Sequence, residues 1–252
     1  SMGICSILSR VGLGMVMQIS CRDRNRIAIQ GDILGGAAMG VCNILCITGD
    51  GVQAGDHPQA HPVFDLDSVS LLGIARTLRD DHHVESGRKI SMAPRVFLGA
   101  AANPFAEPLD WRPLRLAKKI TAGAQFIQTQ YCFDVPRLRR FMGHLEELGC
   151  IDQAYLLVGV GPLRSAKAAE WMRTHVPGLH IPDEVIRRLA GAQDPAREGR
   201  KLCVELIQEI RAIQGVHGVH VMAYRQEESA AEVIERSSVL AGRVPWYPAR
   251  DT

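Results

Sequence analysis

The sequence predicts an α/β protein in which parallel strands alternate with helices, as in a TIM-type (β/α)8 barrel. Six short, nearly continuous apolar runs recur along the 252 residues, each followed by a helical pattern. Such runs are typical of a parallel sheet that is covered on both faces. Polar residues stand at the carboxyl ends of these runs, where barrel enzymes keep their sites. No strand-to-helix turn carries the Gly-x-Gly-x-x-Gly pattern of a doubly wound dinucleotide-binding sheet, the alternative arrangement.

The predicted strands are 15–20 (MVMQIS), 43–50 (NILCITGD), 95–103 (RVFLGAAAN), 126–133 (FIQTQYCF), 154–161 (AYLLVGVG) and 216–224 (VHGVHVMAY). Side chains alternate between the two faces of a strand, so Gln128 and Gln130 share a face of the fourth strand. We expect this face to point into the barrel. Gln130 then lies near the mouth as a binding residue, and Gln128 lies deeper as a structural amide.

Helices are predicted between the strands from the spacing of apolar residues and from their capping residues. A first helix is expected before the first strand, and a short additional helix before the long one near the C-terminal end. Asp67 or Ser68 can cap the second inter-strand helix, and Pro136 suits the first turn of another. The predicted ranges are 2–9, 24–39, 68–79, 113–121, 136–148, 166–173, 181–189, 197–214 and 228–240.

Composition excludes several classes of protein. Charged residues make up 22% of the chain and the formal net charge is +2, with no basic run of the kind that binds nucleic acid. No apolar stretch approaches the roughly 18 residues of a membrane span, and the first ten residues do not form a secretory signal. The seven cysteines are odd in number and include no Cys-x-x-Cys pair, so neither a disulfide framework nor a metal site is expected. These features predict a cytoplasmic protein.

Six strands fall short of the eight that close a barrel of this type. We therefore expect residues 1–252 to form a single but partial barrel domain that lacks the first two βα units. The gap should lie between the strands at 15–20 and 216–224, whose edges are then unpaired. This predicts that the chain is a fragment of a longer protein, and that alone it is poorly soluble or binds its cofactor weakly.

An ordered set of motifs resembles the methylenetetrahydrofolate reductase family. The motifs are QISCRDRNR (18–26), NILCITGD (43–50), FDLDSVSLL (64–72), KKITAGAQFIQTQYCFD (118–134) and GVHVMAY (218–224). Each is weak alone, but together they cover nearly the whole chain in the family's order. The resemblance implies a flavin-dependent barrel that reduces 5,10-methylenetetrahydrofolate to 5-methyltetrahydrofolate in one-carbon metabolism. It also implies that FAD lies across the carboxyl ends of the strands.

The resemblance implies roles for individual residues. Asp50 matches an aspartate near the flavin and the pterin, where its charge assists catalysis and contacts the folate. Gln130 matches a glutamine that hydrogen-bonds the pterin, and an amide offers both a donor and an acceptor. Tyr224 and Arg225 stand where a basic residue of the family contacts substrate, with the register shifted by about one residue. The residues implied to bind the flavin are Gln18, Thr48, Gly49, Asp50, Phe64, Asp65, Asn103, Lys118 and Lys119.

Two of these positions depart from the family pattern. Gln18 replaces a residue that is often histidine, and Asn103 replaces tyrosine in the better-known members. The family's general acid is a glutamate near the end of the first strand, and no residue of this sequence can be assigned that role. The alternative interpretation is therefore a non-catalytic subunit that binds folate or flavin within a methyl-transfer complex. The reductant (NADH, NADPH or ferredoxin) stays undetermined, as does a homo-oligomer or an electron-donor protein as partner.

Overall fold

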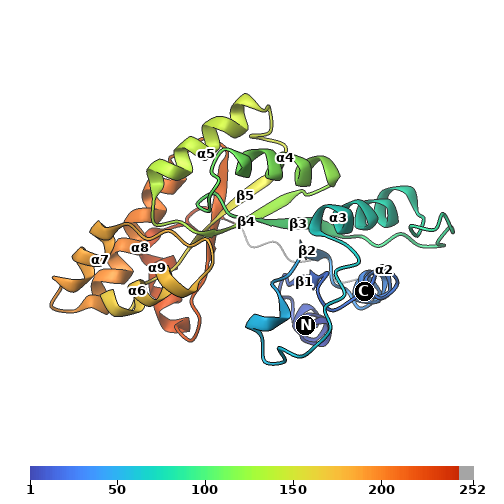
Figure 1. The fold of residues 1–252 in the computed structure, drawn as a ribbon, viewed down its shortest axis with the longest axis horizontal. Coiled ribbons are helices and arrows are strands. Elements are labelled where there is room, and N and C mark those ends of the chain that lie inside the picture. The colour runs from blue at the N-terminus through green and yellow to red at the C-terminus, as the bar shows by residue number, and fades with distance from the viewer. Residues whose placement is uncertain (244–252) are drawn as a thin grey trace. The chain divides into compact units, whose positions relative to one another are not determined.

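A computed structural model describes residues 1–243. It contains six strands, all in one sheet, in the order β1-β2-β3-β4-β5-β6, and the fold is a parallel α/β sheet of the TIM-barrel-like type (Figure 1). The strands are β1 (Val16–Ser20), β2 (Asn43–Ile47), β3 (Phe97–Ala102), β4 (Phe126–Tyr131), β5 (Tyr155–Val160) and β6 (Val216–Val221). All six predicted strands are confirmed. β1 and β6 stand at the two ends of the strand order, as the sequence predicts.

Each predicted helix is also present, with ends within a few residues of the expected ones. The helices are α1 (Met2–Arg10), α2 (Arg26–Ala38), α3 (Ser68–Arg76), α4 (Trp111–Ala122), α5 (Val135–Glu147), α6 (Ala166–His175), α7 (Asp183–Ala190), α8 (Pro195–Arg211) and α9 (Glu227–Ser237). Asp67 is the cap of α3, because its carboxylate accepts a hydrogen bond from the Ser70 amide at 2.8 Å. Among residues 1–243, none of the helices has the length and apolar character needed to cross a bilayer.

Among the boundaries that differ from the prediction are the ends of α3, β2 and β6. The helix predicted to reach Arg79 ends at Arg76 and continues as a π turn, Thr77–Asp81, which the left-handed His82 (φ 58°) terminates. The strand predicted over 43–50 ends at Ile47, because Gly49 has a φ of +91° that a strand does not accommodate. The last strand ends at Val221, so Tyr224 lies in the loop beyond it.

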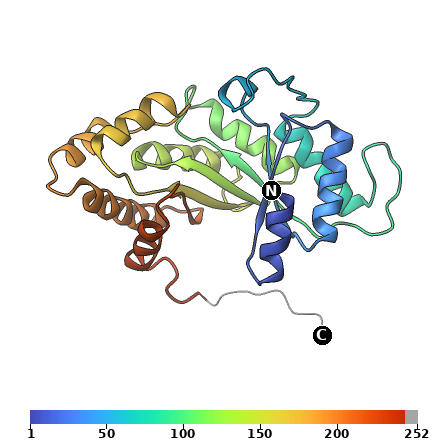
Figure 2. The ribbon, with the colours of Figure 1, turned by 90° about the horizontal axis from the view of Figure 1, so that it is seen from below.

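The chain divides into two compact units. The first holds residues 1–101 and 118–126, and the second holds residues 102–117 and 127–243. In the first unit β1 pairs in parallel with β2 and β2 with β3, and α1 packs beside α2 (Figures 1 and 2). Leu71 and Leu72 of α3, Ile29 and Ile33 of α2 and Ile44 of β2 are fully buried in its core. The prediction of a single domain over residues 1–252 stays a prediction.

In the second unit β5 pairs in parallel with β6, with a register shift between Leu156 and Leu157. The long helix α8 packs on these two strands and also contacts α5, α7 and α9. Its buried side chains recur at helical spacing (Leu202, Leu206, Ile210), so the amphipathic pattern of the sequence places this face against the sheet. Gly199 lets α8 pack closely against the backbone of Leu163, because a Cβ at residue 199 would overlap the Leu163 carbonyl.

Candidate functional site

In the first unit, the carboxyl ends of β1 and β2 and a loop crossing them form one group of predicted residues. The Cys21 amide donates to the Ile47 carbonyl at 3.2 Å, which holds the two strand ends together. The loop is fixed beside them by bonds from the Val63 amide to the Arg22 carbonyl (2.7 Å) and from the Phe64 amide to the Cys21 carbonyl (3.1 Å). The strand ends and this loop therefore form a defined local surface.

Phe64 has an unusual conformation on this surface. Its φ is +41°, a region that bulky residues rarely enter, and the residue is 39% exposed. Backbone strain of this kind costs about 1–3 kcal/mol and persists only where surrounding contacts hold the residue. Here the hydrogen bonds donated by the Val63 and Phe64 amides hold it. The loop thus presents an aromatic side chain to solvent beside the end of β1.

Asp50 lies in the exposed turn after β2. Its charge acts on Arg22, whose guanidinium makes a bidentate contact with Asp23 at 2.6 and 3.0 Å. The pKa of Arg22 is raised, first by the hydrogen bond and the charge of Asp23 and to a smaller extent by Asp50. Asp50 is therefore an exposed carboxylate whose charge acts on a cation that is already paired.

Gly49 is required by the fold itself. A Cβ at this position would come within 2.3 Å of the Ser20 hydroxyl oxygen and 3.1 Å of the Arg22 Cβ. Its positive φ adds a second reason, because side chains are strained in that region. The family resemblance implies that Gly49 binds the flavin. Because the fold needs a glycine here in any case, loss of flavin in a Gly49→Val protein would not show that Gly49 contacts the cofactor.

Thr48 and Asp65 are engaged in contacts within the protein. The Thr48 hydroxyl accepts the Ser68 amide at 3.0 Å, at the start of α3. Asp65 binds Arg26 through both carboxylate oxygens at 2.9 Å and also accepts the Arg26 amide at 2.9 Å. These hydrogen bonds lower the pKa of Asp65 from 3.8 to about 2. These contacts are sufficient to explain why the fold needs Thr48 and Asp65 at these positions. The predicted cofactor roles of the two residues stay predictions.

Gln18 and the two lysines complete the first group. Gln18 is exposed between the buried Met17 and Ile19, so it lies on the face of β1 opposite to the core. The Lys119 ammonium of α4 donates to the Ala101 carbonyl of β3 at 2.7 Å and also lies close enough to Cys46 to affect its pKa. Burial nevertheless raises the pKa of Cys46 to about 12, so this thiol stays protonated. Lys118 is exposed.

In the second unit, Gln130 is half-buried on β4, and its side-chain oxygen accepts the amide of Tyr131 at 3.0 Å. The Tyr131 hydroxyl in turn donates to the Met222 carbonyl at 3.1 Å, after β6. Gly161 makes this possible, because a Cβ there would lie 2.5 Å from the tyrosine ring and 2.2 Å from the same carbonyl. The Gln130 amide nitrogen has no hydrogen-bond partner within residues 1–243, so Gln130 keeps a donor available.

Asn103 follows β3, and both ends of its side-chain amide make contacts within the fold. Its amide nitrogen donates to the Gly178 carbonyl at 3.0 Å and its oxygen accepts the Phe105 amide at 3.0 Å. A Cβ at Gly178 would meet that amide nitrogen at 2.5 Å, so the glycine permits the contact. Asparagine at a position that is tyrosine in better-known members thus closes a loop, and its predicted flavin contact stays a prediction.

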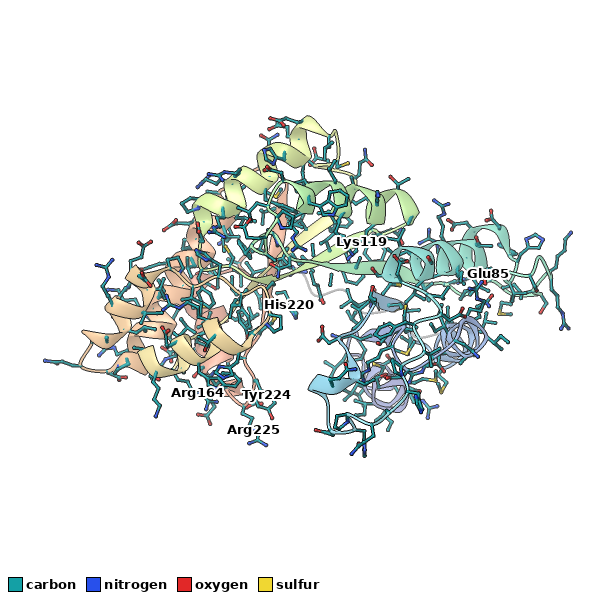
Figure 3. All side chains as sticks on the ribbon, viewed as in Figure 1. Glu85, Lys119, Arg164, His220, Tyr224 and Arg225 are labelled. Atoms are coloured by element: carbon teal, nitrogen blue, oxygen red, sulfur yellow. The ribbon has the colours of Figure 1, made fainter. Side chains whose placement is uncertain are left out.

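Tyr224 and Arg225 form an exposed tip beyond β6 (Figure 3). Tyr224 is 79% exposed, and the Arg225 guanidinium lies 5.3 Å from the centre of its ring. Arg164 fixes the tip by donating to the carbonyls of Tyr224 (3.2 Å) and Arg225 (2.8 Å). The loop is therefore anchored through its backbone while both side chains remain accessible.

Sequence reasoning missed His220 on β6. Its Nδ1 is buried and has no hydrogen-bond partner within the described residues, and burial lowers the pKa of its imidazole. Its register partner on β5 is Gly159, so no side chain of that residue covers it. An imidazole within an apolar strand is the signal that could have identified it.

The predicted residues thus fall into two groups. Those of the first unit are Gln18, Thr48, Gly49, Asp50, Phe64, Asp65, Lys118 and Lys119, and those of the second are Asn103, Gln130, Tyr224 and Arg225. Of the flavin residues, Gln18, Asp50 and Phe64 present exposed side chains, whereas Thr48, Asp65 and Asn103 are used by the fold. In the first unit, the exposed aromatic and polar side chains therefore suit a planar, polar cofactor, whereas Thr48 and Asp65 are already bound within the fold.

Comparison with known proteins gives consistent results. Residues 1–238 match the family model described as methylenetetrahydrofolate reductase. Methylenetetrahydrofolate reductase 2 of Schizosaccharomyces pombe is 24% identical over 245 residues, covering 90% of this chain and 36% of that protein. A probable methylenetetrahydrofolate reductase (NADPH) of Caenorhabditis elegans is 21% identical over 238 residues, covering 91% and 33%. The chain spans about a third of the length of these curated relatives.

Among solved structures, an uncharacterized protein from Clostridium thermocellum, described as binding two copies of 5-methyl-5,6,7,8-tetrahydrofolic acid, aligns with a TM-score of 0.48 and 14% identity. The alignment covers 92% of this chain and 97% of that one, and a similarity at this level carries no argument about ligands. The family assignment depends on the sequence match, which extends from α1 through the end of α9. The chain belongs to the methylenetetrahydrofolate reductase family.

Proposed function

We propose that this chain takes part in the FAD-dependent reduction of 5,10-methylenetetrahydrofolate to 5-methyltetrahydrofolate, in the cytoplasm. The family match over residues 1–238 supports the reductase-type role. The proposed site rests on the exposed surface at the ends of β1 and β2. There Phe64 is held in a strained conformation beside β1, which bears Gln18, and the turn after β2, which bears Asp50. When bound, FAD would supply the hydride-transfer chemistry.

The chain's own residues would bind and orient the reactants. Phe64 offers an exposed ring against which a planar ring system can stack. Gln18 and Lys119 offer hydrogen-bond donors to polar and anionic groups of the cofactor. Asp50 is a carboxylate that can stabilise positive charge developing on the folate during reduction.

The second unit would contribute to folate binding. Gln130 has its oxygen fixed by the Tyr131 amide, so its amide nitrogen is oriented as a donor toward a pterin acceptor. Arg225 and Tyr224 extend from an anchored loop and would contact the substrate's anionic and aromatic parts. The reductant class (nicotinamide nucleotide or ferredoxin) and the oligomeric state are left open by this proposal.

The experiment compares the parent with Asp50→Asn after reconstitution with FAD. Flavin binding is measured from the visible flavin absorbance, and turnover from the anaerobic reoxidation of reduced flavin by 5,10-methylenetetrahydrofolate. Asparagine keeps the shape and removes the charge, so flavin content should persist while folate reduction slows by about 10²–10³, or roughly 2.7–4 kcal/mol. Exposed Asp152 in the second unit, changed to asparagine, serves as the charge-matched control.

Equal turnover of Asp50→Asn and parent would contradict the assigned role of Asp50. A protein that binds folate but neither retains FAD nor turns over would instead support the alternative of a non-catalytic binding subunit.

A further inference from the structure

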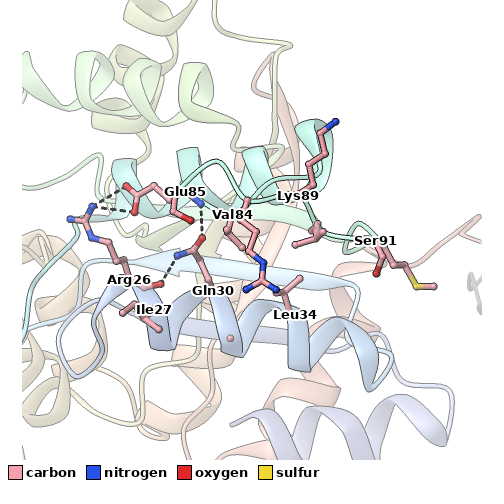
Figure 4. A pocket seen from close by; sticks show the side chains of 13 residues that line it. Arg26, Ile27, Gln30, Leu34, Val84, Glu85, Lys89 and Ser91 are labelled. Carbon is pink, nitrogen blue, oxygen red and sulfur yellow. Dashed lines mark hydrogen bonds and ion pairs between the residues drawn. The ribbon is translucent and has the colours of Figure 1, made fainter.

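The chain forms a short hairpin, residues 82–90, directly after the π turn. A groove lies in the first unit between α2 and this hairpin (Figure 4). We call it the α2 groove. Its volume is about 790 Å3. One wall is formed by Arg26, Ile27, Gln30, Gly31 and Leu34 of α2, and the other by residues 84–86 and 88–92 of the hairpin and the segment that follows it. None of the residues predicted to bind cofactor or substrate lines it, so its role is separate from the proposed active site.

Hydrogen bonds hold the two walls of the α2 groove in place. The hairpin is closed by bonds from the Val84 amide to the Arg88 carbonyl (3.0 Å) and from the Ile90 amide to the His82 carbonyl (2.9 Å). It is tied to α2 by the Glu85 amide, which donates to Gln30 at 2.8 Å, and by the Arg26–Glu85 ion pair at 3.0 Å. The contacts that tie Glu85 to Gln30 and Arg26 are drawn in Figure 4. A groove with fixed walls loses little entropy when a ligand binds.

The walls are apolar and open. Ile27 is 77% exposed and Met92 is 82% exposed, and they face the groove from opposite walls. Ile27, Gly31 and Leu34 follow one another at positions i, i+4 and i+7, so they form one face of α2. Gly31 has no side chain and nothing lies within 4 Å of the Cβ position there. The middle of this face is therefore a depression between two apolar side chains.

The charge of the α2 groove is positive. Glu85 is neutralised by Arg26, which also binds Asp65. Arg88 and Lys89 are exposed, and within residues 1–243 neither forms an ion pair. The α2 groove thus combines the apolar face of α2 with two cations on the hairpin wall. A ligand with both acidic and apolar groups would complement it.

We propose that the α2 groove docks an acidic amphipathic helix of a protein partner. An apolar side chain of the partner fills the depression over Gly31, with neighbouring apolar residues against Ile27, Leu34 and Met92. Acidic residues at the edge of the partner helix pair with Arg88 and Lys89. This is the helix-in-groove mode of recognition, in which apolar anchors supply affinity and charges supply orientation.

The test uses a fluorescein-labelled synthetic peptide of about 16 residues with leucines at i, i+3, i+4 and i+7 and glutamates on its remaining positions. Its basic counterpart carries lysine for glutamate. Binding to the full chain is measured by fluorescence anisotropy. The acidic peptide should bind at least about tenfold more tightly than the basic one, with an affinity that falls as salt is added.

Gly31→Gln places a side chain in the depression, starting from a Cβ position that has no described atom within 4 Å, and should weaken binding by at least about tenfold. Gly73→Gln on α3 is the matched control, because nothing lies within 4 Å of its Cβ position either, and it should bind as the parent does. The double variant Arg88→Glu, Lys89→Glu should lose the acidic peptide and gain the basic one. Circular dichroism verifies that each variant is folded.

Three results would overturn the proposal. The acidic peptide could bind no better than the basic one, or Gly31→Gln could bind it as the parent does. A dimer of the parent that Gly31→Gln dissociates would show that a second copy of the chain occupies the α2 groove instead.

Discussion

Replacement of Gly159 by alanine tests how the strands around Gln130 are packed. A Cβ at Gly159 would lie 2.4 Å from the Thr129 carbonyl oxygen, 2.7 Å from the Gln130 carbonyl oxygen and 2.7 Å from the Met222 methyl group. The closest of these is about 1 Å short of the 3.4 Å at which ordinary contact begins. Because two of the three atoms are backbone, the methionine alone cannot relieve the overlap.

Overpacking of a core typically costs about 1–3 kcal/mol, and the backbone contacts place Gly159→Ala at about 3 kcal/mol. For a chain of this size each kcal/mol lowers the melting temperature by about 2–4 °C, so a decrease of about 6–12 °C is expected. The assay is thermal unfolding followed by circular dichroism. The displaced Gln130 backbone should also weaken folate binding, which calorimetry measures on the same samples.

Gly143 supplies a control in which the same substitution acts in the opposite direction. It lies within α5, and nothing is within 4 Å of its Cβ position. Alanine there gains about 0.5–1 kcal/mol because glycine is the more flexible residue in a helix. Gly143→Ala should therefore melt about 2 °C higher than the parent. A Gly159→Ala protein as stable as the parent would refute the packing described here.

Two further predictions follow from the contacts of single carboxyl and amide groups. Gln130→Glu keeps the oxygen that accepts the Tyr131 amide but loses the N–H donor. The melting temperature should therefore change little, while folate affinity, measured by calorimetry, falls about 10-fold or more. Unchanged affinity would exclude Gln130 from the folate site. The Asp65 pKa of about 2 lies below its unfolded value of 3.8, so the stability from the Arg26 contact is present above about pH 4 and lost as pH falls toward 2. Asp65→Asn should flatten this part of the melting-temperature profile against pH, and an identical profile would show that another group causes it.

Much of the fold could be predicted because local patterns report it directly. Continuous apolar runs identify buried parallel strands, and the strand at 126–133 was found from its β-branched and aromatic residues. Capping residues such as Asp67 then locate helix starts to within about two residues. Strand ends were less predictable. The strand at 43–47 stops before Thr48 because of the backbone angle at Gly49, which a glycine in the sequence permits but does not require.

The candidate site could be predicted only as a set of residue types at strand ends. Motif order predicted roles for Asp50, Gln130 and Lys119, but it did not reveal which polar groups the protein already uses. Asn103 and Thr48 proved to be engaged by Gly178 and Ser68, partners 75 and 20 residues away in the chain. His220 was missed for the same reason, since only the packing around it shows that its buried nitrogen has no partner among residues 1–243.

The sequence by itself determined the alternation of strands and helices, because hydrophobic periodicity and capping act over a few residues. It also determined the family, because its motifs keep their order along the chain. The tertiary structure decided which side chains remain free for a ligand and where an open groove lies. Hydrogen bonds such as that between Asn103 and Gly178, and the empty space over Gly31, arise between segments that only folding brings together.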